Sequence, residues 1–206
     1  MLSAVNALES VTTSHLTNGT PAFDSYNANV PLDNGTKVPV AVTVVSAPYI
    51  TVPFDVALSN FGGFYAGFNL MAVRPAVGDA FKLKVTYSNG TSEFLTSSVT
   101  GVLDSFAQNP TTSGANPNIP TFNWAAPAVP PGPYTYRLNV RQQNGSQAWD
   151  YPRDSGIPST QTSVAYNFDG RANPVLLVTG TVYDWTITVR DSNRNEAQRQ
   201  SSYKPL

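Results

Sequence analysis

Cysteine is missing from this 206-residue chain, and histidine occurs once, at His15. Without cysteine there is no disulfide framework, no thiolate nucleophile and no cysteine-based metal site. A Ser-His-Asp triad would have to use His15, but the chain has no G-x-S-x-G motif to present the serine. One histidine without cysteine also leaves almost no basis for a zinc site. These absences argue against the commonest nucleophilic and zinc-dependent chemistries.

Charged side chains are scarce. They make up 12% of the residues, with a net charge of −1, against about 25% in a typical soluble domain. A chain without a basic excess lacks the electrostatic footprint of a nucleic-acid-binding protein. Its solubility must come from hydroxyl and amide side chains, a composition typical of extracellular β-sandwiches. We therefore expect a secreted or cell-surface protein with no nucleic-acid partner.

Long apolar runs are also missing. No stretch approaches the roughly 18–20 apolar residues that a membrane-spanning helix needs, so we expect no membrane insertion. Residues 1–16 have neither the basic start nor the long apolar core of an intact signal peptide.

The carboxylates are not arranged for catalysis. Only three glutamates are present, Glu9, Glu93 and Glu196, and they lie far apart in the sequence. Most aspartates stand beside Gly, Asn or Ser, as Asp33 and Asp169 do, and these are turn positions. A carboxylate pair for glycoside hydrolysis is not indicated. We expect a protein that is not an enzyme.

Two loops have some character of calcium sites, because oxygen-bearing side chains alternate in Asp191–Glu196 and recur in Asn167–Asn173. The first lacks the sixth-position glycine and the twelfth-position glutamate of a calcium-binding loop. Turns explain both segments better, so we predict no cofactor and keep calcium only as a disfavoured alternative.

What the sequence does contain is β-strand patterning along most of its length. The clearest hairpin runs through Ala80–Leu103, where Asn89-Gly90 separates two arms and predicts a type I′ turn. Apolar residues alternate with polar ones in its first arm, at Phe81, Leu83, Val85 and Tyr87. A second β system starts at Thr121, and strands with turn signals between them recur every 10 to 15 residues, as in a sandwich.

The C-terminal half contains a more specific pattern. Leu177 precedes Gly180 by three residues, Tyr183 follows it by three, and Trp185 continues the face of Tyr183. Trp124 lies in an early strand of the same half. The arrangement resembles the tyrosine corner and core tryptophan of immunoglobulin-like and fibronectin type III modules, which occur in tandem on bacterial secreted and surface proteins. The resemblance covers residues 118–206 and implies structural roles for Trp124, Tyr183 and Trp185.

We therefore predict an all-β protein of two tandem Ig-like/fibronectin type III-like antiparallel β-sandwiches, with a short irregular or helical N-terminal segment. The expected divisions are an N-terminal arm at 1–29, a first module at 30–106, a linker at 107–120 and a second module at 121–206. The linker assignment rests on a stretch rich in Pro, Asn, Gly and Ser.

Trp149 and Tyr151 flank Asp150 in a short strand that ends at Pro152. If this aromatic pair is half exposed at a sheet edge, it can stack on sugar rings or anchor a protein; otherwise it covers the edge. Four Asn-Gly-Ser/Thr sequences match glycosylation acceptors and hairpin turns equally well: Asn18, Asn34, Asn89 and Asn144.

The N-terminal segment has apolar residues three apart, at Leu2, Val5, Leu8 and Val11. This spacing suits a short amphipathic helix, whereas the β-prone Val11–Thr17 suits a strand along a sheet edge. An arm that pairs with a neighbouring copy would form a filament. The other reading, which the usual behaviour of chain termini favours, is a leader that is disordered or packs on its own chain. We expect a non-catalytic structural or adhesion module whose partners are proteins or copies of itself. A carbohydrate-binding accessory module that recognises polysaccharide is the alternative.

Overall fold

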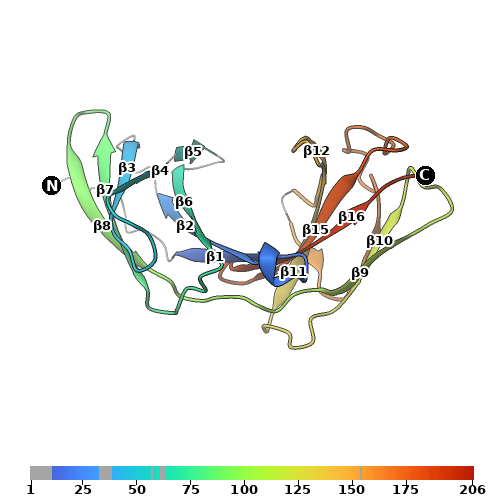
Figure 1. Ribbon diagram of the computed structural model, residues 1–206, viewed down its shortest axis with the longest axis horizontal. Coiled ribbons are helices and arrows are strands. Elements are labelled where there is room, and N and C mark those ends of the chain that lie inside the picture. The colour runs from blue at the N-terminus through green and yellow to red at the C-terminus, as the bar shows by residue number, and fades with distance from the viewer. Residues whose placement is uncertain (1–10, 33–38, 57, 61–63, 154) are drawn as a thin grey trace. The chain divides into compact units, whose positions relative to one another are not determined.

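The computed structural model describes residues 11–32, 39–56, 58–60, 64–153 and 155–206. Apart from a 3-10 turn, η1 (Pro21–Phe23), the regular structure in these ranges is β-strand. The chain divides into two compact units (Figure 1). Unit 1 comprises residues 1–15 and 25–102, and unit 2 comprises residues 16–24 and 103–206. The protein is therefore all-β, with one β-sandwich in each unit.

Unit 1 packs two antiparallel sheets against each other. One sheet has the order β4-β3-β7-β8, and the other contains β2, β6 and β5, with β1 beside β2. The strands are β1 (Thr12–Thr17, of which the last two residues belong to unit 2), β2 (Ser25–Leu32), β3 (Pro39–Ser46), β4 (Phe54–Val56), β5 (Leu58–Asn60), β6 (Phe64–Met71), β7 (Ala80–Tyr87) and β8 (Ser92–Ser98). The core lies between the sheets because the alternating apolar side chains of β7 point inward and are buried, with Val42, Val44, Ala28 and Val30 around them.

The β7–β8 hairpin forms at the predicted position but with a different turn. Gly90 has a positive φ of 80°, whereas Asn89 does not. The Gly90 N–H donates to Tyr87 O at 2.9 Å, and the Asn89 side-chain oxygen accepts from the Thr91 N–H at 3.0 Å. A type I′ turn requires positive φ at both central residues. The prediction of that turn type is therefore wrong, because the Asn89 side chain caps the loop and leaves the left-handed position to glycine alone.

Unit 2 is the more regular sandwich. Its three-stranded sheet has the order β14-β10-β9 and faces a sheet of order β12-β11-β15-β16, in which β13 also pairs with β11. The strands are β9 (Gln108–Ser113), β10 (Thr121–Ala125), β11 (Tyr134–Gln142), β12 (Gln147–Tyr151), β13 (Ile157–Pro158), β14 (Ser163–Ala165), β15 (Tyr183–Asp191) and β16 (Glu196–Tyr203).

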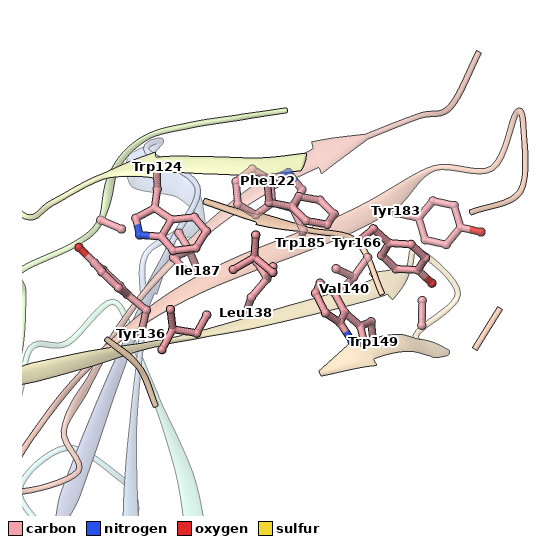
Figure 2. Close-up of a cluster of buried hydrophobic side chains, with 14 of the residues drawn as sticks. Phe122, Trp124, Tyr136, Leu138, Val140, Trp149, Tyr166, Tyr183, Trp185 and Ile187 are labelled. Carbon is pink, nitrogen blue, oxygen red and sulfur yellow. The ribbon is translucent and has the colours of Figure 1, made fainter. Parts of the chain in front are cut away.

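The core of unit 2 is rich in aromatic side chains. Figure 2 shows Phe122 and Trp124 of β10 directed at side chains of β11 and β15. The Phe122 and Trp185 rings lie 4.9 Å apart, and Trp124 meets Tyr136 edge-on at 5.3 Å. Tilted and edge-to-face contacts of this kind are the favoured aromatic geometries. Trp124, Tyr183 and Trp185 are all buried.

The segment predicted as a linker, residues 107–120, is part of unit 2. Residues 108–113 form β9, which pairs with β10 from Thr121 opposite Ser113 to Ala125 opposite Gln108. Leu103 and Ala107 are buried in the unit 2 core. The composition predicts a linker here because β9 is a polar edge strand. Main-chain pairing with β10 holds this strand, and its side chains contribute little to the core.

The predicted N-terminal arm, residues 1–29, is also partly wrong. Its described part contains β1, η1 and the first half of β2. Val11 is fully buried in the unit 1 core, and its N–H donates to Ser98 O at 3.0 Å. Residues 16–24 belong to unit 2, where an added Cβ on Gly19 would meet the Arg199 guanidinium at 2.4 Å. Residues 1–10, where a helix was one possibility, lie outside the described residues.

Candidate functional site

Of the predicted aromatic pair on β12, Tyr151 is partly exposed to solvent and Trp149 is buried. Trp149 is 2% exposed, and its indole N–H donates to Asp169 Oδ1 at 2.8 Å. The indole stacks on Tyr151 at 5.3 Å. The suggestion that Trp149 is half exposed is therefore wrong. Its register partner on β11 is the buried Val140, so Trp149 faces the core.

Aromatic contacts continue outward from Trp149 to the surface. Tyr151 is half-buried and meets the Phe168 ring edge-on, with centroids 5.9 Å apart. Phe168 itself is 69% exposed. Sequence patterning missed Phe168 because it lies in a turn after Asn167, whose φ is +61°, and turns have no apolar periodicity.

Phe168 belongs to the long connection between β14 and β15, residues 166–182. Partly buried hydrogen bonds attach this loop to tyrosine side chains of unit 2. The Tyr166 hydroxyl donates to Pro174 O at 2.6 Å, and the Tyr183 hydroxyl accepts from the Val178 N–H at 3.0 Å. The second contact is the one that the tyrosine-corner pattern predicts.

Further polar contacts attach the loop to the rest of unit 2. The Leu177 N–H donates to Asn118 O at 2.9 Å, and the Asn118 side chain donates back to Leu177 O. The Asn173 N–H donates to Ala148 O at 2.8 Å, and the Gly180 N–H donates to Pro205 O at 2.9 Å. A 17-residue loop without strands is unusual in a compact domain. Here it is anchored at many points.

The anchored loop presents apolar side chains to solvent. Leu177 is buried under the loop, but Val175, Leu176 and Val178 are 63%, 50% and 51% exposed. The Asn167 amide donates to Val175 O at 3.3 Å, which places the start of the loop beside its second half. We call Phe168, Val175, Leu176 and Val178 the loop surface. Exposed apolar groups that cluster on one segment are a feature of interaction sites.

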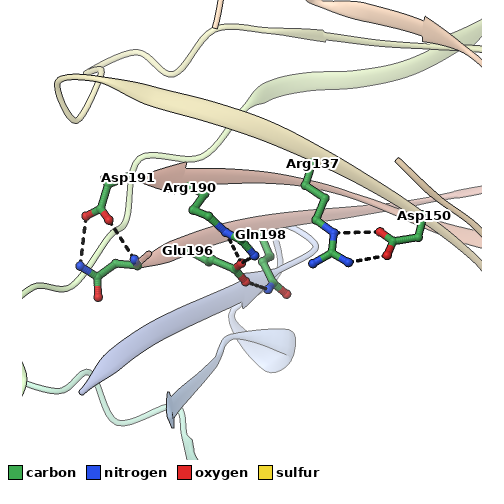
Figure 3. A network of polar contacts seen from close by, with 7 residues as sticks. Arg137, Asp150, Arg190, Asp191, Glu196 and Gln198 are labelled. Carbon is green, nitrogen blue, oxygen red and sulfur yellow. Dashed lines mark hydrogen bonds and ion pairs between the residues drawn. The ribbon is translucent and has the colours of Figure 1, made fainter. Parts of the chain in front are cut away.

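Several charged groups of unit 2 bind one another (Figure 3). On the outer face of the β12-β11-β15-β16 sheet, the Arg137 guanidinium binds both oxygens of Asp150, with 2.8 Å from Nε to Oδ1. The Asp150 contact raises the pKa of Arg137. On the same face, Arg190 binds Glu196, whose other oxygen accepts from Gln198 at 2.7 Å. These side chains brace neighbouring strands.

The two calcium-like segments form hydrogen-bonded turns. Asp191 Oδ1 accepts from the Asn193 and Asn195 N–H groups at 2.9 and 2.8 Å, and Oδ2 accepts from the Asn195 amide. In the other segment, Asp169 Oδ1 accepts from the Arg171 N–H at 3.2 Å as well as from Trp149. Within the described ranges, no three His, Cys, Asp or Glu residues come together as metal ligands.

His15 lies in β1, is almost fully buried and stacks on Tyr26 with ring centroids 3.9 Å apart. Of the predicted assembly residues, Leu2, Val5 and Leu8 fall outside the described residues. Val11 is a core residue of unit 1. The assignment of Val11 to an assembly interface is therefore wrong, because its side chain is already buried within its own unit.

No protein-family model matches the chain, and no curated protein matches it. Among solved structures, the chain is similar to a two-domain fibronectin type III segment from chicken tenascin. The similarity covers 97% of this chain and 99% of that one, at 14% identity and a TM-score of 0.39. In the part of the chain that the structure describes, no helix has the length and apolarity to cross a membrane.

Proposed function

We propose that the chain is a non-catalytic interaction module of a secreted or cell-surface protein, and that it binds a protein partner through the loop surface. The observation that carries this proposal is the exposure of Phe168, Val175, Leu176 and Val178 on a loop anchored by internal hydrogen bonds. A surface that is already in its binding shape loses little conformational entropy when a partner docks.

The carboxylates of unit 2 described above bind other groups of the same unit, and this supports a role in binding rather than in catalysis. The Asp150 and Glu196 carboxylates pair with arginines of the same sheet, and the Asp191 carboxylate caps its own hairpin loop. Such groups stabilise strands and turns. More specifically, we propose that the protein is a structural or adhesive subunit of a bacterial surface filament. This part of the proposal rests on the resemblance of residues 118–206 to fibronectin type III and immunoglobulin-like modules.

A photo-crosslinking residue placed at Leu176 tests the proposal in cells that make the protein. The matched control carries the same residue at Val129, which is 75% exposed and lies in unit 2 outside the loop surface. A protein partner identified at position 176 and not at position 129 is the expected result. Equal labelling at both positions, or none at 176, overturns the proposal.

The Tyr151–Phe168 contact favours a second candidate function, an accessory module that binds polysaccharide. A partly exposed aromatic pair can stack on sugar rings, but Trp149 cannot contribute because it is buried. A glycan array on the isolated protein tests this candidate. Binding that Phe168→Ala abolishes, and that Phe94→Ala on the exposed part of unit 1 leaves intact, would support it. An array without any bound glycan would reject it.

A further inference from the structure

We infer that the loop surface of unit 2 is the receptor for residues 1–10 of a second copy of this chain. The inference rests on the proposed function, since it names the partner of that same surface. It joins two features: an anchored apolar loop in unit 2, and an apolar segment that leads into the first strand of unit 1.

The receptor has the properties of a preformed docking site. Leu176 and Val178 flank the buried Leu177, so they project from a backbone that Asn118 holds on both sides of Leu177. The Phe168 ring rests against Tyr151 at the other end of the loop. Aliphatic and aromatic groups fixed in this way suit the apolar side chains of a peptide.

The ligand segment is identified by its chemistry and by the point where it joins the fold. Residues 1–10 carry Leu2, Val5 and Leu8 with Ala4 and Ala7 between them. Val11 is fixed in the core of unit 1, with its N–H bonded to Ser98 O. Ten residues can extend at most about 35 Å from that anchor. Apolar side chains at this spacing match an apolar receptor on a neighbouring molecule.

The receptor loop carries one charge of each sign, Asp169 and Arg171. Asp169 Oδ1 already accepts from Trp149 and from the Arg171 N–H, which leaves the Arg171 guanidinium to pair with a carboxylate of the segment. The only charged side chain in residues 1–10 is Glu9. Arg171 is exposed and follows Phe168 by three residues. A carboxylate at the end of the ligand segment can therefore meet a guanidinium at the side of the receptor, which favours one orientation of docking.

The two surfaces differ, so the contact is heterologous. Each copy offers one segment and one receptor, and such head-to-tail contacts leave a free segment and a free receptor at opposite ends of every assembly. The contact would therefore produce open chains of copies that lengthen with concentration.

Complementation between two full-length variants tests the inference. One variant carries Leu176→Asp in the receptor, and the other carries Leu2→Asp, Val5→Asp and Leu8→Asp in the segment. Light scattering should show wild-type mass rising with concentration, and each variant alone should keep the mass of one chain. An equimolar mixture should reach twice that mass and stop, because only one productive contact remains. Phe168→Ser should weaken wild-type association by roughly tenfold or more.

The controls separate this inference from the proposed function. Val129→Asp changes an exposed apolar residue of unit 2 outside the loop surface and should associate like wild type. Wild-type protein that stays monomeric at every concentration overturns the inference. Association that persists in both Leu176→Asp and Phe168→Ser also overturns it. In either case, a different protein cross-linked at position 176 would leave the proposed function standing.

Discussion

Replacing Tyr183 by phenylalanine should destabilise unit 2 selectively. The Tyr183 side chain is fully buried, and its hydroxyl accepts the Val178 N–H at 3.0 Å. Phenylalanine keeps the ring packing but leaves that N–H without its acceptor. The Tyr183 hydroxyl is buried but the hydrogen bond is only partly so, because Val178 is 51% exposed. A donor that loses its partner costs about 1–3 kcal/mol where water is excluded, and we expect a loss near the lower end of that range in the free energy of unfolding.

Tryptophan fluorescence during urea unfolding measures this loss in one unit. The chain has three tryptophans, Trp124, Trp149 and Trp185, and all three lie in unit 2. The fluorescence transition therefore reports unit 2, whereas far-UV circular dichroism reports both units. Tyr183→Phe should lower the midpoint of the fluorescence transition and leave its slope unchanged, since the exposed area on unfolding is the same.

Two tyrosine variants serve as matched controls. Tyr87→Phe in unit 1 removes the hydroxyl that donates to Glu93, and it should leave the fluorescence midpoint unchanged. Tyr151→Phe removes a half-buried hydroxyl of unit 2 and should change the free energy of unfolding by less than about 0.5 kcal/mol. A Tyr183→Phe midpoint equal to that of wild type would refute the reasoning that this hydroxyl holds the loop to the sandwich.

The remaining predictions concern the core, a turn and alkaline pH. Trp124→Ala should cost about 3–5 kcal/mol by the same fluorescence assay, because it leaves a cavity beside Tyr136; a neutral result would exclude a core role. Gly145→Ala should cost about 1–2 kcal/mol, since Gly145 has a φ of +90°, and an unchanged midpoint would count against that turn geometry. Burial raises the pKa of Tyr136 and Tyr166 above the ordinary value of 10.0. Unfolding frees these hydroxyls to ionise at their ordinary pKa. The free energy of unfolding should therefore keep its full value below about pH 10 and decrease as the pH rises further. Urea midpoints between pH 8 and 11.5 measure this, and a flat profile would contradict the burial of both hydroxyls.

Much of the fold could be predicted from alternation and turn residues. The apolar side chains of Phe81, Leu83, Val85 and Tyr87 face one way because strand geometry has a period of two, and the structure buries all four. The tyrosine-corner spacing likewise located the contact between Tyr183 and Val178. These signals are local, so a single sequence is enough to detect them.

The features that were missed depend on tertiary context. Period two places Trp149 and Tyr151 on one face but does not say whether that face meets the core, and pairing with Val140 decides it. The polar strand β9 has no apolar face to detect, since its pairing with β10 is a main-chain property. Phe168 and Leu176 lie in a loop shaped by distant partners such as Asn118, so their exposure follows from no local pattern.

The caps on the Asn-Gly turns bear on how long the protein stays chemically intact. Spontaneous loss of ammonia from Asn-Gly sequences begins when the glycine nitrogen attacks the side-chain carbon of the asparagine. In the β7–β8 turn the Gly90 N–H is bonded to Tyr87 O, and the Asn89 side-chain oxygen is held by both the N–H and the hydroxyl of Thr91. The Asn144 turn repeats the bond from glycine to the preceding strand and the cap from Ser146. The glycine nitrogen must lose its proton before it attacks, and in both turns that N–H is engaged by a carbonyl of the preceding strand. We therefore expect both hairpin turns to slow the loss of ammonia from the Asn-Gly sequences that form them.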